Sequence, residues 1–329
     1  MKKILIIHTG GTFGMMPLKP SEVLAPGKFQ DKIQLLVPEI NRIADIDVHV
    51  LFNLDSSDIG IEQWNLLAEF IFEKLNSYDG FVIVHGTDTM VYTAAALSFS
   101  LPNISKPVIL TGAQRPLSKF RNDARLNLID AVELATMEIP EVLIVFGQKI
   151  LRGNRSKKVS IFDYRAFRSS NFPLLGEIGV GIQLDESKIL PLQGETSLRS
   201  GFKPEVAVIS VHPSMNPDNF LSLLNEPIKV YILQGFGAGN LPNEILSWIP
   251  FISSATDKGK LVFIGSHSIS GSVDLNLYAS AKSALEAGAH GIGEMTVEAA
   301  YVKLQKILAQ TQDKQEILQK FSENWAGEF

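Results

Sequence analysis

Short runs of apolar residues recur along the first half of the chain, and each run ends in small polar residues. Several runs are continuous rather than alternating in hydrophobicity, which is typical of parallel strands covered on both faces. Between the runs lie segments in which apolar residues have helical spacing. The expected strands are 4–7, 48–52, 81–84, 108–110 and 142–146, and the expected helices are 61–75, 90–101 and 122–137. This alternation predicts an α/β domain with a parallel sheet.

The same alternation returns in the second half after an interruption. Residues 148–171 are basic and irregular in pattern, and from 184 to 204 the periodicity fades while prolines and glycines gather. Thr296 has the position of an N-cap before a last helix, with Glu298 in its first turn. The other expected elements are strands at 206–211, 230–233 and 261–264 and helical segments at 220–224, 244–252 and 278–287.

We therefore expect two α/β domains. The larger N-terminal domain would span 1–184 and carry a flavodoxin-like parallel sheet, a linker would follow at 185–204, and a smaller C-terminal domain would span 205–329.

Composition excludes several classes of function. The 329 residues include no cysteine, so disulfides, thiolate metal sites and cysteine nucleophiles are all excluded. The net charge of −5 gives no reason to expect a nucleic acid or an anionic membrane as partner. The apolar run after Lys2 and Lys3 stops after four residues, whereas a signal peptide needs about 7–15. We expect a soluble, cytoplasmic protein.

Candidate chemistry gathers where the expected strands end. Ligands of open parallel sheets bind beyond the carboxyl ends of the strands. Four loops there offer hydroxyls, carboxylates and glycines, at 9–12, 55–58, 85–89 and 111–114. Gly10 and Gly11 could serve a sharp turn, or they could expose backbone N–H groups to a ligand as an oxyanion hole. The four loops together favour a small polar ligand.

Other interpretations of these residues stay open at this point. Residues 87–89 could be a helix cap. His8 and His85 stand at strand ends, but the chain contains neither a His-Glu-x-x-His nor a Gly-x-Ser-x-Gly motif, so a structural role is favoured for both. The glycines of 235–239 lack the spacing of a dinucleotide loop, and no P-loop sequence occurs. We expect neither a cofactor nor a metal.

The motifs as a whole resemble one enzyme family. Residues 9–14, TGGTFG, closely resemble the first signature of the bacterial L-asparaginases, and residues 85–90, HGTDTM, resemble the second. The block RGNRSKK at 152–158 is similar to the segment that carries the family's catalytic lysine, and it favours the cytoplasmic type. The first two motifs, in order and about 75 residues apart, are highly specific. Further matches are 55–58, 237–240 and 295–299, and the resemblance runs from residue 3 to about 310.

The resemblance implies hydrolysis of asparagine by a threonine nucleophile. Thr12 would attack the amide carbon. Lys158 would take a proton from Thr87, while Asp88 holds the lysine, and Thr87 would then activate the attacking group or the water. An amine can act as a base only in its uncharged form, so desolvation must outweigh the charge of Asp88.

The resemblance also assigns the binding residues and the assembly. Asp55, Ser56 and Ser57 would bind the substrate's α-amino and α-carboxylate groups. The backbone of Ala113 would meet the side-chain amide, and Gly11 would lie against the substrate. Asn240 would reach the site of a neighbouring subunit in an intimate homodimer, which would assemble as a tetramer.

This sequence departs from the family pattern at two places. The segment 15–29 has no tyrosine to pair with the nucleophile. Lys157 stands where relatives often have threonine, which leaves two adjacent lysines, of which Lys158 aligns with the catalytic one.

Three alternatives to asparaginase stay open. A glutaminase-asparaginase would also accept glutamine, whose side chain is one methylene longer than that of asparagine. A pocket discriminates between two such substrates by about 1–3 kcal/mol of binding free energy. An amidotransferase subunit acting on misacylated tRNA shares these motifs, although such subunits usually add an N-terminal domain. A non-catalytic amino-acid-binding protein would require loss of Thr12, Thr87, Asp88 or Lys158, and all four are present.

Overall fold

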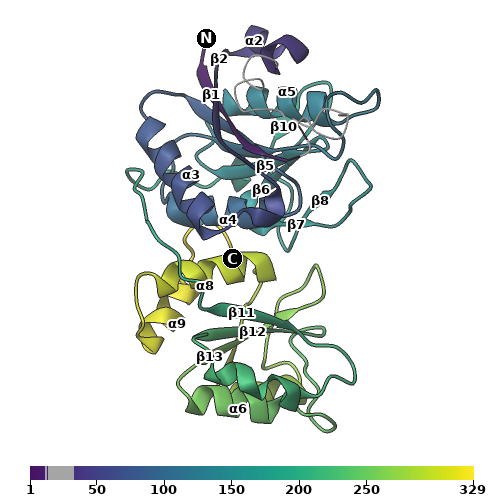
Figure 1. Cartoon of the computed structure of the whole chain (residues 1–329), viewed down its shortest axis with the longest axis vertical. Helices are drawn as coiled ribbons and strands as arrows, with labels where there is room; N and C mark the ends of the chain where they lie inside the picture. Colours follow the sequence, from purple (N-terminus) through teal and green to yellow (C-terminus); the bar gives the residue numbers. More distant parts are fainter. Residues whose placement is uncertain (12, 14–32) are drawn as a thin grey trace. The chain divides into compact units, whose positions relative to one another are not determined.

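The structure is a computed structural model, and it describes residues 1–11, 13 and 33–329. The chain divides into two compact units, Met1–Ser200 and Gly201–Phe329 (Figure 1). Each unit is built on its own main sheet with helices packed against it. The prediction of two α/β domains, with the larger one first, is confirmed.

The sheet of the N-terminal unit has eight strands in the order β10-β9-β6-β5-β4-β3-β1-β2. The expected strands of the first half form its parallel part: β1 (Lys3–Gly10), β2 (Asp45–Leu54), β3 (Gly80–Val84), β4 (Val108–Thr111) and β5 (Val142–Phe146). Their order 2-1-3-4-5 is that of flavodoxin-like sheets, and the strand order reverses between β1 and β3. The loops after these two strands therefore lie at the topological switch point, where such folds bind ligands.

Three antiparallel strands extend this sheet beyond β5: β6 (Lys149–Arg152), β9 (Gly176–Ile178) and β10 (Ile182–Leu184). A separate hairpin pairs β7 (Ser156–Lys158) with β8 (Phe167–Ser169) (Figure 1). The expectation that 148–171 is irregular was therefore wrong. Strands of three or four residues rich in lysine and arginine carry no apolar alternation, and pairing with neighbours sets their conformation instead.

Alternate side chains of β1 enter two different cores. Ile4 and Ile6 pack with α5 (Ala124–Ala135) and α2 (Ile40–Ile43) on one face. Leu5 and Ile7 pack with α3 (Ile61–Lys74) and α4 (Met90–Ser100) on the other. Burial on both faces explains why the strand is continuously apolar. Among the described residues of this unit, short 3₁₀ segments lie at η2 (Ser56–Asp58), η3 (Gly153–Arg155) and η4 (Glu186–Lys188).

The C-terminal unit has four parallel strands: β11 (Val206–Ser210), β12 (Val230–Gly235), β13 (Leu261–Ser266) and β14 (Ala289–Gly291). Its helices are η5 (Pro217–Asn225), α6 (Ile249–Asp257), α7 (Ala279–Glu286), α8 (Val297–Leu308) and α9 (Lys314–Ser322).

Two details of the C-terminal unit bear on the predicted helix ends. The Thr296 hydroxyl accepts a hydrogen bond of 3.0 Å from the backbone N–H of Ala299, so the predicted N-cap of α8 is confirmed. The helix expected at 244–252 begins only at Ile249, because Leu246 has a φ of 53°, which a right-handed helix cannot contain. In the described part of the chain, no helix combines the length and apolar character needed to cross a bilayer.

Candidate active site

The loops that follow β1, β2 and β3 meet through closely spaced backbones. A Cβ placed on Gly11 would lie 2.5 Å from the Cα of Gly86, and one placed on Gly86 would lie 2.6 Å from the Cβ of Ser56. Gly11 also has a φ of 83°, in the left-handed region. Neither glycine can carry a side chain here without displacing its neighbour, so three of the four predicted loops converge at one point.

The segment after β3 does more than begin α4. Thr89 stands at the N-cap position of α4, but its hydroxyl donates a 2.5 Å hydrogen bond to the backbone oxygen of Ser56 instead of capping the helix. This bond ties the segment to the loop after β2. Thr87 is left half-buried and Asp88 exposed, directly before the first turn of α4.

Lys158 of β7 completes a three-residue group with these side chains. Its Nζ donates to the Oγ1 of Thr87 at 2.7 Å and to the Oδ1 of Asp88 at 2.6 Å. The lysine side chain is only 14% exposed, while that of Asp88 is 66% exposed. As an ammonium Lys158 donates both bonds, and once uncharged its lone pair could accept the Thr87 proton. The geometry therefore suits proton transfer between Lys158 and Thr87.

The two adjacent lysines have different places in β7. Successive side chains of a strand point to opposite faces, so Lys157 and Lys158 cannot both face Thr87. In the hairpin, Lys157 stands opposite Arg168 of β8, and Lys158 stands opposite Phe167. Lys158, the lysine that the family resemblance favours, is the one whose Nζ reaches Thr87.

The loop after β2 presents a carboxylate and hydroxyls beside the group. The Oδ1 of Asp55 accepts hydrogen bonds from the backbone N–H of Ser57 at 2.9 Å and from its hydroxyl at 2.7 Å. These two bonds, the backbone one first, hold the pKa of Asp55 below its usual value of 3.8. Asp55 and Ser57 are exposed, whereas Ser56 is buried. The loop can therefore offer an ionised carboxylate to an ammonium group.

A buried polar cluster fixes the loop that contains Ala113. The carboxylate of Asp123 accepts hydrogen bonds from the backbone N–H of Gln114 at 2.9 Å and from that of Arg115 at 3.0 Å. Asn127 donates to the backbone oxygen of Gly112 at 2.9 Å and to Asp123 at 3.1 Å. Ala113 itself is buried. Sequence reasoning missed Asp123 and Asn127, although two polar residues spaced i, i+4 at the start of a helix after β4 were a usable signal.

The sequence placed Gln114 in the candidate loop 111–114 but suggested no separate role for it. Its Oε1 accepts a long hydrogen bond of 3.4 Å from the Thr87 hydroxyl. Its Nε2 donates to the backbone oxygens of Ser160 and Asp163 at 3.2 and 3.3 Å. Gln114 thus links Thr87 to the loop between β7 and β8. This loop directly follows Lys158, so the link helps to position the lysine.

The two histidines at strand ends are buried and neutral. Desolvation lowers the pKa of His85 to about 4, and likewise that of His8 to about 4. The Nδ1 of His85 lies 2.6 Å from the backbone oxygen of Gly86, so this nitrogen must carry the hydrogen, and the Nε2 accepts from the Thr93 hydroxyl at 2.9 Å. His85 therefore supports the loop that carries Thr87.

Two further predicted residues are Thr12 and Asn240. Thr12 lies outside the described residues. Asn240 belongs to the C-terminal unit, where Phe236 and Asn240 exchange backbone hydrogen bonds of 2.9 and 2.8 Å around the turn 237–239. The chain folds back at this turn rather than entering a helix, so the loop lacks the geometry of a dinucleotide site.

Comparisons with known proteins show the family of this chain. Residues 3–190 match the family model "Asparaginase, N-terminal", and residues 205–321 match "Glutaminase/Asparaginase C-terminal domain". The chain belongs to the asparaginase family. L-asparaginase 1 of Escherichia coli (strain K12) is 37% identical over 99% of this chain and 98% of its own length.

The proteins similar to this chain include one that is not called an asparaginase. A glutamyl-tRNA(Gln) amidotransferase subunit from Pyrococcus abyssi is 34% identical over 100% of this chain and 77% of its own length. Among solved structures, the thermostable L-asparaginase from Thermococcus kodakarensis has a TM-score of 0.92 at 32% identity and covers 99% of both chains. L-asparaginase I from Vibrio cholerae has a TM-score of 0.88 at 35% identity and covers 100% of this chain and 99% of its own.

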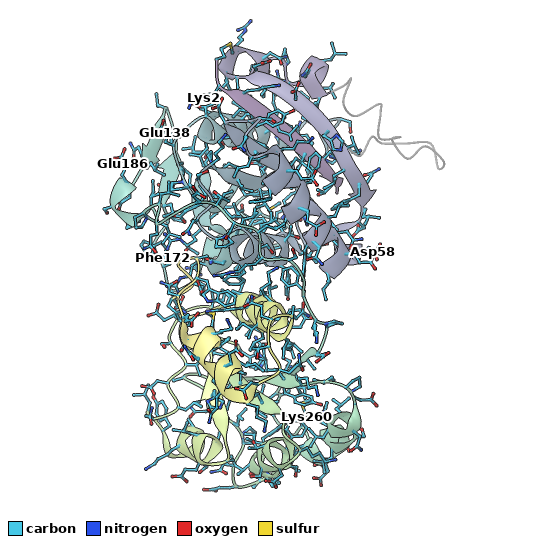
Figure 2. All side chains as sticks on the ribbon, turned by 90° about the vertical axis from the view of Figure 1, so that its left-hand side faces the viewer. Lys2, Asp58, Glu138, Phe172, Glu186 and Lys260 are labelled. Carbon is cyan, nitrogen blue, oxygen red and sulfur yellow. The ribbon has the colours of Figure 1, made fainter. Side chains whose placement is uncertain are left out.

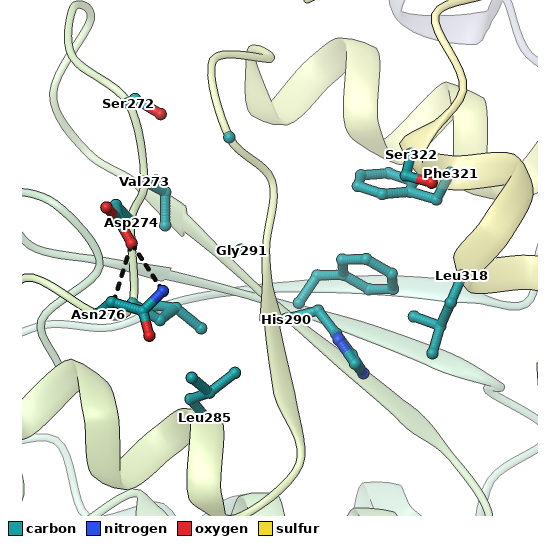
Figure 3. Close-up of a pocket in the computed structure, with 13 residues that line it drawn as sticks. Ser272, Val273, Asp274, Asn276, Leu285, His290, Gly291, Leu318, Phe321 and Ser322 are labelled. Carbon is teal, nitrogen blue, oxygen red and sulfur yellow. Dashed lines mark hydrogen bonds between the residues drawn. The ribbon is translucent and has the colours of Figure 1, made fainter. Parts of the chain in front are cut away.

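A hollow in the C-terminal unit contains none of the predicted residues. It measures about 460 Å³. Figure 3 shows Asp274 and Asn276 on one side of Gly291 and His290 and Phe321 on the other. Asp274 accepts hydrogen bonds from the backbone and side chain of Asn276 at 3.0 and 3.1 Å. Among the described residues, no three His, Asp or Glu side chains are grouped so that they could hold a metal ion.

Proposed function

We propose that this protein hydrolyses L-asparagine to L-aspartate and ammonia through a threonine nucleophile. The observation that carries the proposal is the contact of Lys158 with both Thr87 and Asp88, in a chain of the asparaginase family. A threonine hydroxyl is a poor nucleophile at neutral pH unless a base removes its proton. An amine at hydrogen-bonding distance supplies that base.

The proposed reaction has two halves. The Thr12 oxygen attacks the side-chain amide carbon, and the N–H groups around Gly11 stabilise the oxyanion. The proton lost by the Thr12 hydroxyl passes to the leaving nitrogen, so ammonia departs and an ester to Thr12 remains. Uncharged Lys158 then accepts the proton of Thr87, Thr87 takes a proton from water, and the hydroxide attacks the ester. Aspartate is released, and the proton held by Lys158 returns to the Thr12 oxygen, which restores both groups. Each half forms one C–O bond and breaks one bond to the leaving group.

The binding loops suit a small zwitterion with an amide. The lowered pKa keeps the Asp55 carboxylate ionised for an α-ammonium group. The exposed hydroxyl of Ser57 and the backbone at Ser56 are proposed to receive the α-carboxylate. The Ala113 loop, held by Asp123, is proposed to meet the side-chain amide. An assay of ammonia release from asparagine, with Thr12→Val as control, tests the proposal.

A broader glutaminase-asparaginase is the nearest alternative. Asparagine and glutamine carry the same head group and amide and differ by one methylene, worth about 1–3 kcal/mol in a pocket. We propose asparagine as the preferred substrate on the similarity to L-asparaginase 1. The ratio of the two kcat/KM values decides between the alternatives, and a ratio below 1 contradicts the preference.

The similarity to an amidotransferase subunit motivates a second alternative. A free amidohydrolase releases ammonia without tRNA, whereas a dependence of the rate on misacylated tRNA would indicate the amidotransferase. Binding of asparagine without release of ammonia would indicate an amino-acid-binding protein.

We propose that the active form is a homo-oligomer, an intimate dimer that assembles as a tetramer. Phe120, Ile161 and Phe162 are 102%, 89% and 92% exposed. Their loops lie side by side, because the hydroxyl of Tyr164 donates to the backbone oxygen of Arg121 at 3.1 Å. Large apolar side chains exposed together are typical of an interface, and a second copy of this chain is the proposed occupant.

The proposed dimer places Asn240 in the site of a neighbouring subunit. Mixing Thr12→Val subunits with Asn240→Ala subunits should restore part of the activity, because one hybrid site would carry both native residues. A fully active monomer in light scattering at assay concentration contradicts this assembly.

A cytoplasmic location is proposed on the resemblance of 152–155 to the cytoplasmic type, and cell fractionation tests it.

A further inference from the structure

The block that carries Lys158 begins with an unusually close contact. Gly153 opens η3, and a Cβ placed on it would lie 2.9 Å from the backbone oxygen of Val142 and 3.0 Å from the Cβ of Ala94. Its φ lies outside the left-handed region, so the backbone conformation alone would accept alanine. Glycine is required at this position because there is no room for a side chain, and not because of the backbone conformation.

The partner in this contact belongs to the helix that starts at the site. Ala94 lies just over one turn into α4, and the first residue of α4, Met90, follows Thr87 by three positions and Asp88 by two. Both η3 and β7 pack against α4. Gly153 precedes Lys158 in the chain, and Ala94 follows Thr87. Their contact therefore connects the two segments that carry the proposed base and its partner.

The chain between Gly153 and Lys158 has little freedom to absorb a displacement. The Ser156 hydroxyl donates to the backbone oxygen of Arg152 at 2.7 Å. The backbone N–H of Ser170 donates to the oxygen of Arg155 at 2.7 Å. Lys158 is paired in the hairpin, opposite a buried Phe167. A shift of η3 would consequently be passed on to Lys158.

Further contacts hold the two arginines at the start and end of this block. Arg152 forms a buried ion pair with Glu141, with Nε–Oε2 and Nη2–Oε1 distances of 2.8 and 3.1 Å. The guanidinium groups of Arg152 and Arg155 lie 4.3 and 5.4 Å from the ring centre of Phe172, which Figure 2 labels. Both anchors fix the start of the block relative to the sheet.

We propose that Gly153 is a positioning residue of the reaction. Its missing side chain lets η3 approach α4 closely enough for Lys158 to reach Thr87. A methyl group at this position pushes η3 from Ala94 and Val142 by a few tenths of an ångström, and the Nζ–Oγ1 bond of 2.7 Å lengthens. The proposal rests on the proposed role of Lys158 in proton transfer.

The test begins with Gly153→Ala and a matched control. Gly179→Ala adds the same methyl group in the same unit, where no atom lies within 4 Å of the added Cβ. We expect Gly153→Ala to lower kcat by about 10- to 100-fold, the size of effect that misplacement of a catalytic group produces, with KM changed by less than about twofold. Gly179→Ala should leave both constants unchanged. Equal kcat values for the two variants overturn the proposal.

A second pair of variants separates positioning from general damage. If Gly153 acts through Lys158, then Gly153→Ala should cause no further loss of kcat in a Lys158→Met background. A merely structural effect would lower kcat by the same factor in both backgrounds, and that result overturns the proposal. Ala94→Ser, which adds one atom on the α4 side of the contact, should reproduce a smaller loss if Gly153→Ala fails to fold.

Crystal structures supply a readout that does not depend on the reaction. The separation of Lys158 Nζ from Thr87 Oγ1 should be longer by a few tenths of an ångström in Gly153→Ala and remain near 2.7 Å in the Gly179→Ala control. An unchanged separation overturns the positioning role. Absence of ammonia release by wild type contradicts the proposed function instead, so the two failures are distinguishable.

Discussion

Lys158 donates a 2.7 Å hydrogen bond to Thr87, although 71 positions of the chain separate them. Two routes through the fold bring them together. Thr87 follows β3 directly, whereas Lys158 is reached from β5 through the antiparallel turn into β6 and then η3. Both routes end at one place because η3 and β7 pack against α4, the helix that follows Thr87. The proposed chemistry depends on this meeting.

Replacing each of the two adjacent lysines should give opposite results. Methionine keeps most of the apolar stem and removes the amine, so a loss of rate reports chemistry rather than packing. We expect Lys158→Met to lower kcat by about 10²–10⁴-fold, the usual contribution of a general base. Lys157→Met should retain nearly full activity. Steady-state kinetics with asparagine measure both, and the reverse outcome would shift the proposed base by one residue.

Asp130 should destabilise the folded protein near neutral pH. It is 8% exposed in α5, and burial, assisted by the charge of Glu133, raises its pKa from 3.8 to about 6. The folded state therefore holds this proton to higher pH than the unfolded state does. Its contribution to the free energy of unfolding is most favourable below pH 3.8 and falls as the pH rises to about 6.

Asp130→Asn should consequently raise the free energy of unfolding at pH 7 by about 1–3 kcal/mol. The gain should shrink as the pH falls from about 6 towards 3.8. Urea unfolding at several pH values measures it, with the exposed Glu138→Gln as a control for the loss of one negative charge. A gain that does not depend on pH would rule out the titration of Asp130 as its cause.

His85 should make the protein sensitive to acid. Burial lowers its pKa from 6.5 to about 4, so the unfolded state binds a proton first when the pH falls. Stability contributed by the neutral ring is present above pH 6.5 and is lost as the pH falls towards 4. In urea unfolding at several pH values, His85→Gln should be less stable at pH 7 but show a shallower fall between pH 6.5 and 4. An unaltered slope in His85→Gln would contradict this account.

The hydrophobic pattern predicted most of the layered fold. Ile4 to Ile7 of β1 are all buried because helices cover both faces, and that condition is visible as an unbroken apolar run. The pattern failed where tertiary pairing decides the structure. Strand β7 reads Ser-Lys-Lys and owes its conformation to β8. The late start of α6 at Ile249 likewise follows from the backbone at Leu246.

Part of the site could also be predicted from the positions of the expected strands. The rule that ligands bind at the carboxyl ends of parallel strands placed the loops around Gly11, Ser56 and Gly86 together, and the structure brings them into contact. No periodicity pointed to Lys158, which was assigned only through the family resemblance. Asp123 was missed because an acidic residue before a helix is usually an exposed cap, whereas here it is buried and binds backbone N–H groups.

The most direct test of the central claim is ammonia release from L-asparagine by wild type, Thr87→Val and Thr87→Ser at equal enzyme concentration. We expect wild type to release ammonia and aspartate in equal amounts, and Thr87→Val to lower kcat by about 10²–10⁴-fold because the relay from Lys158 loses its hydroxyl. Thr87→Ser, which keeps a hydroxyl at the same place, should recover part of the rate. A folded wild-type protein that releases no ammonia from asparagine, or a Thr87→Val variant that keeps more than about a tenth of the wild-type kcat, would contradict the account.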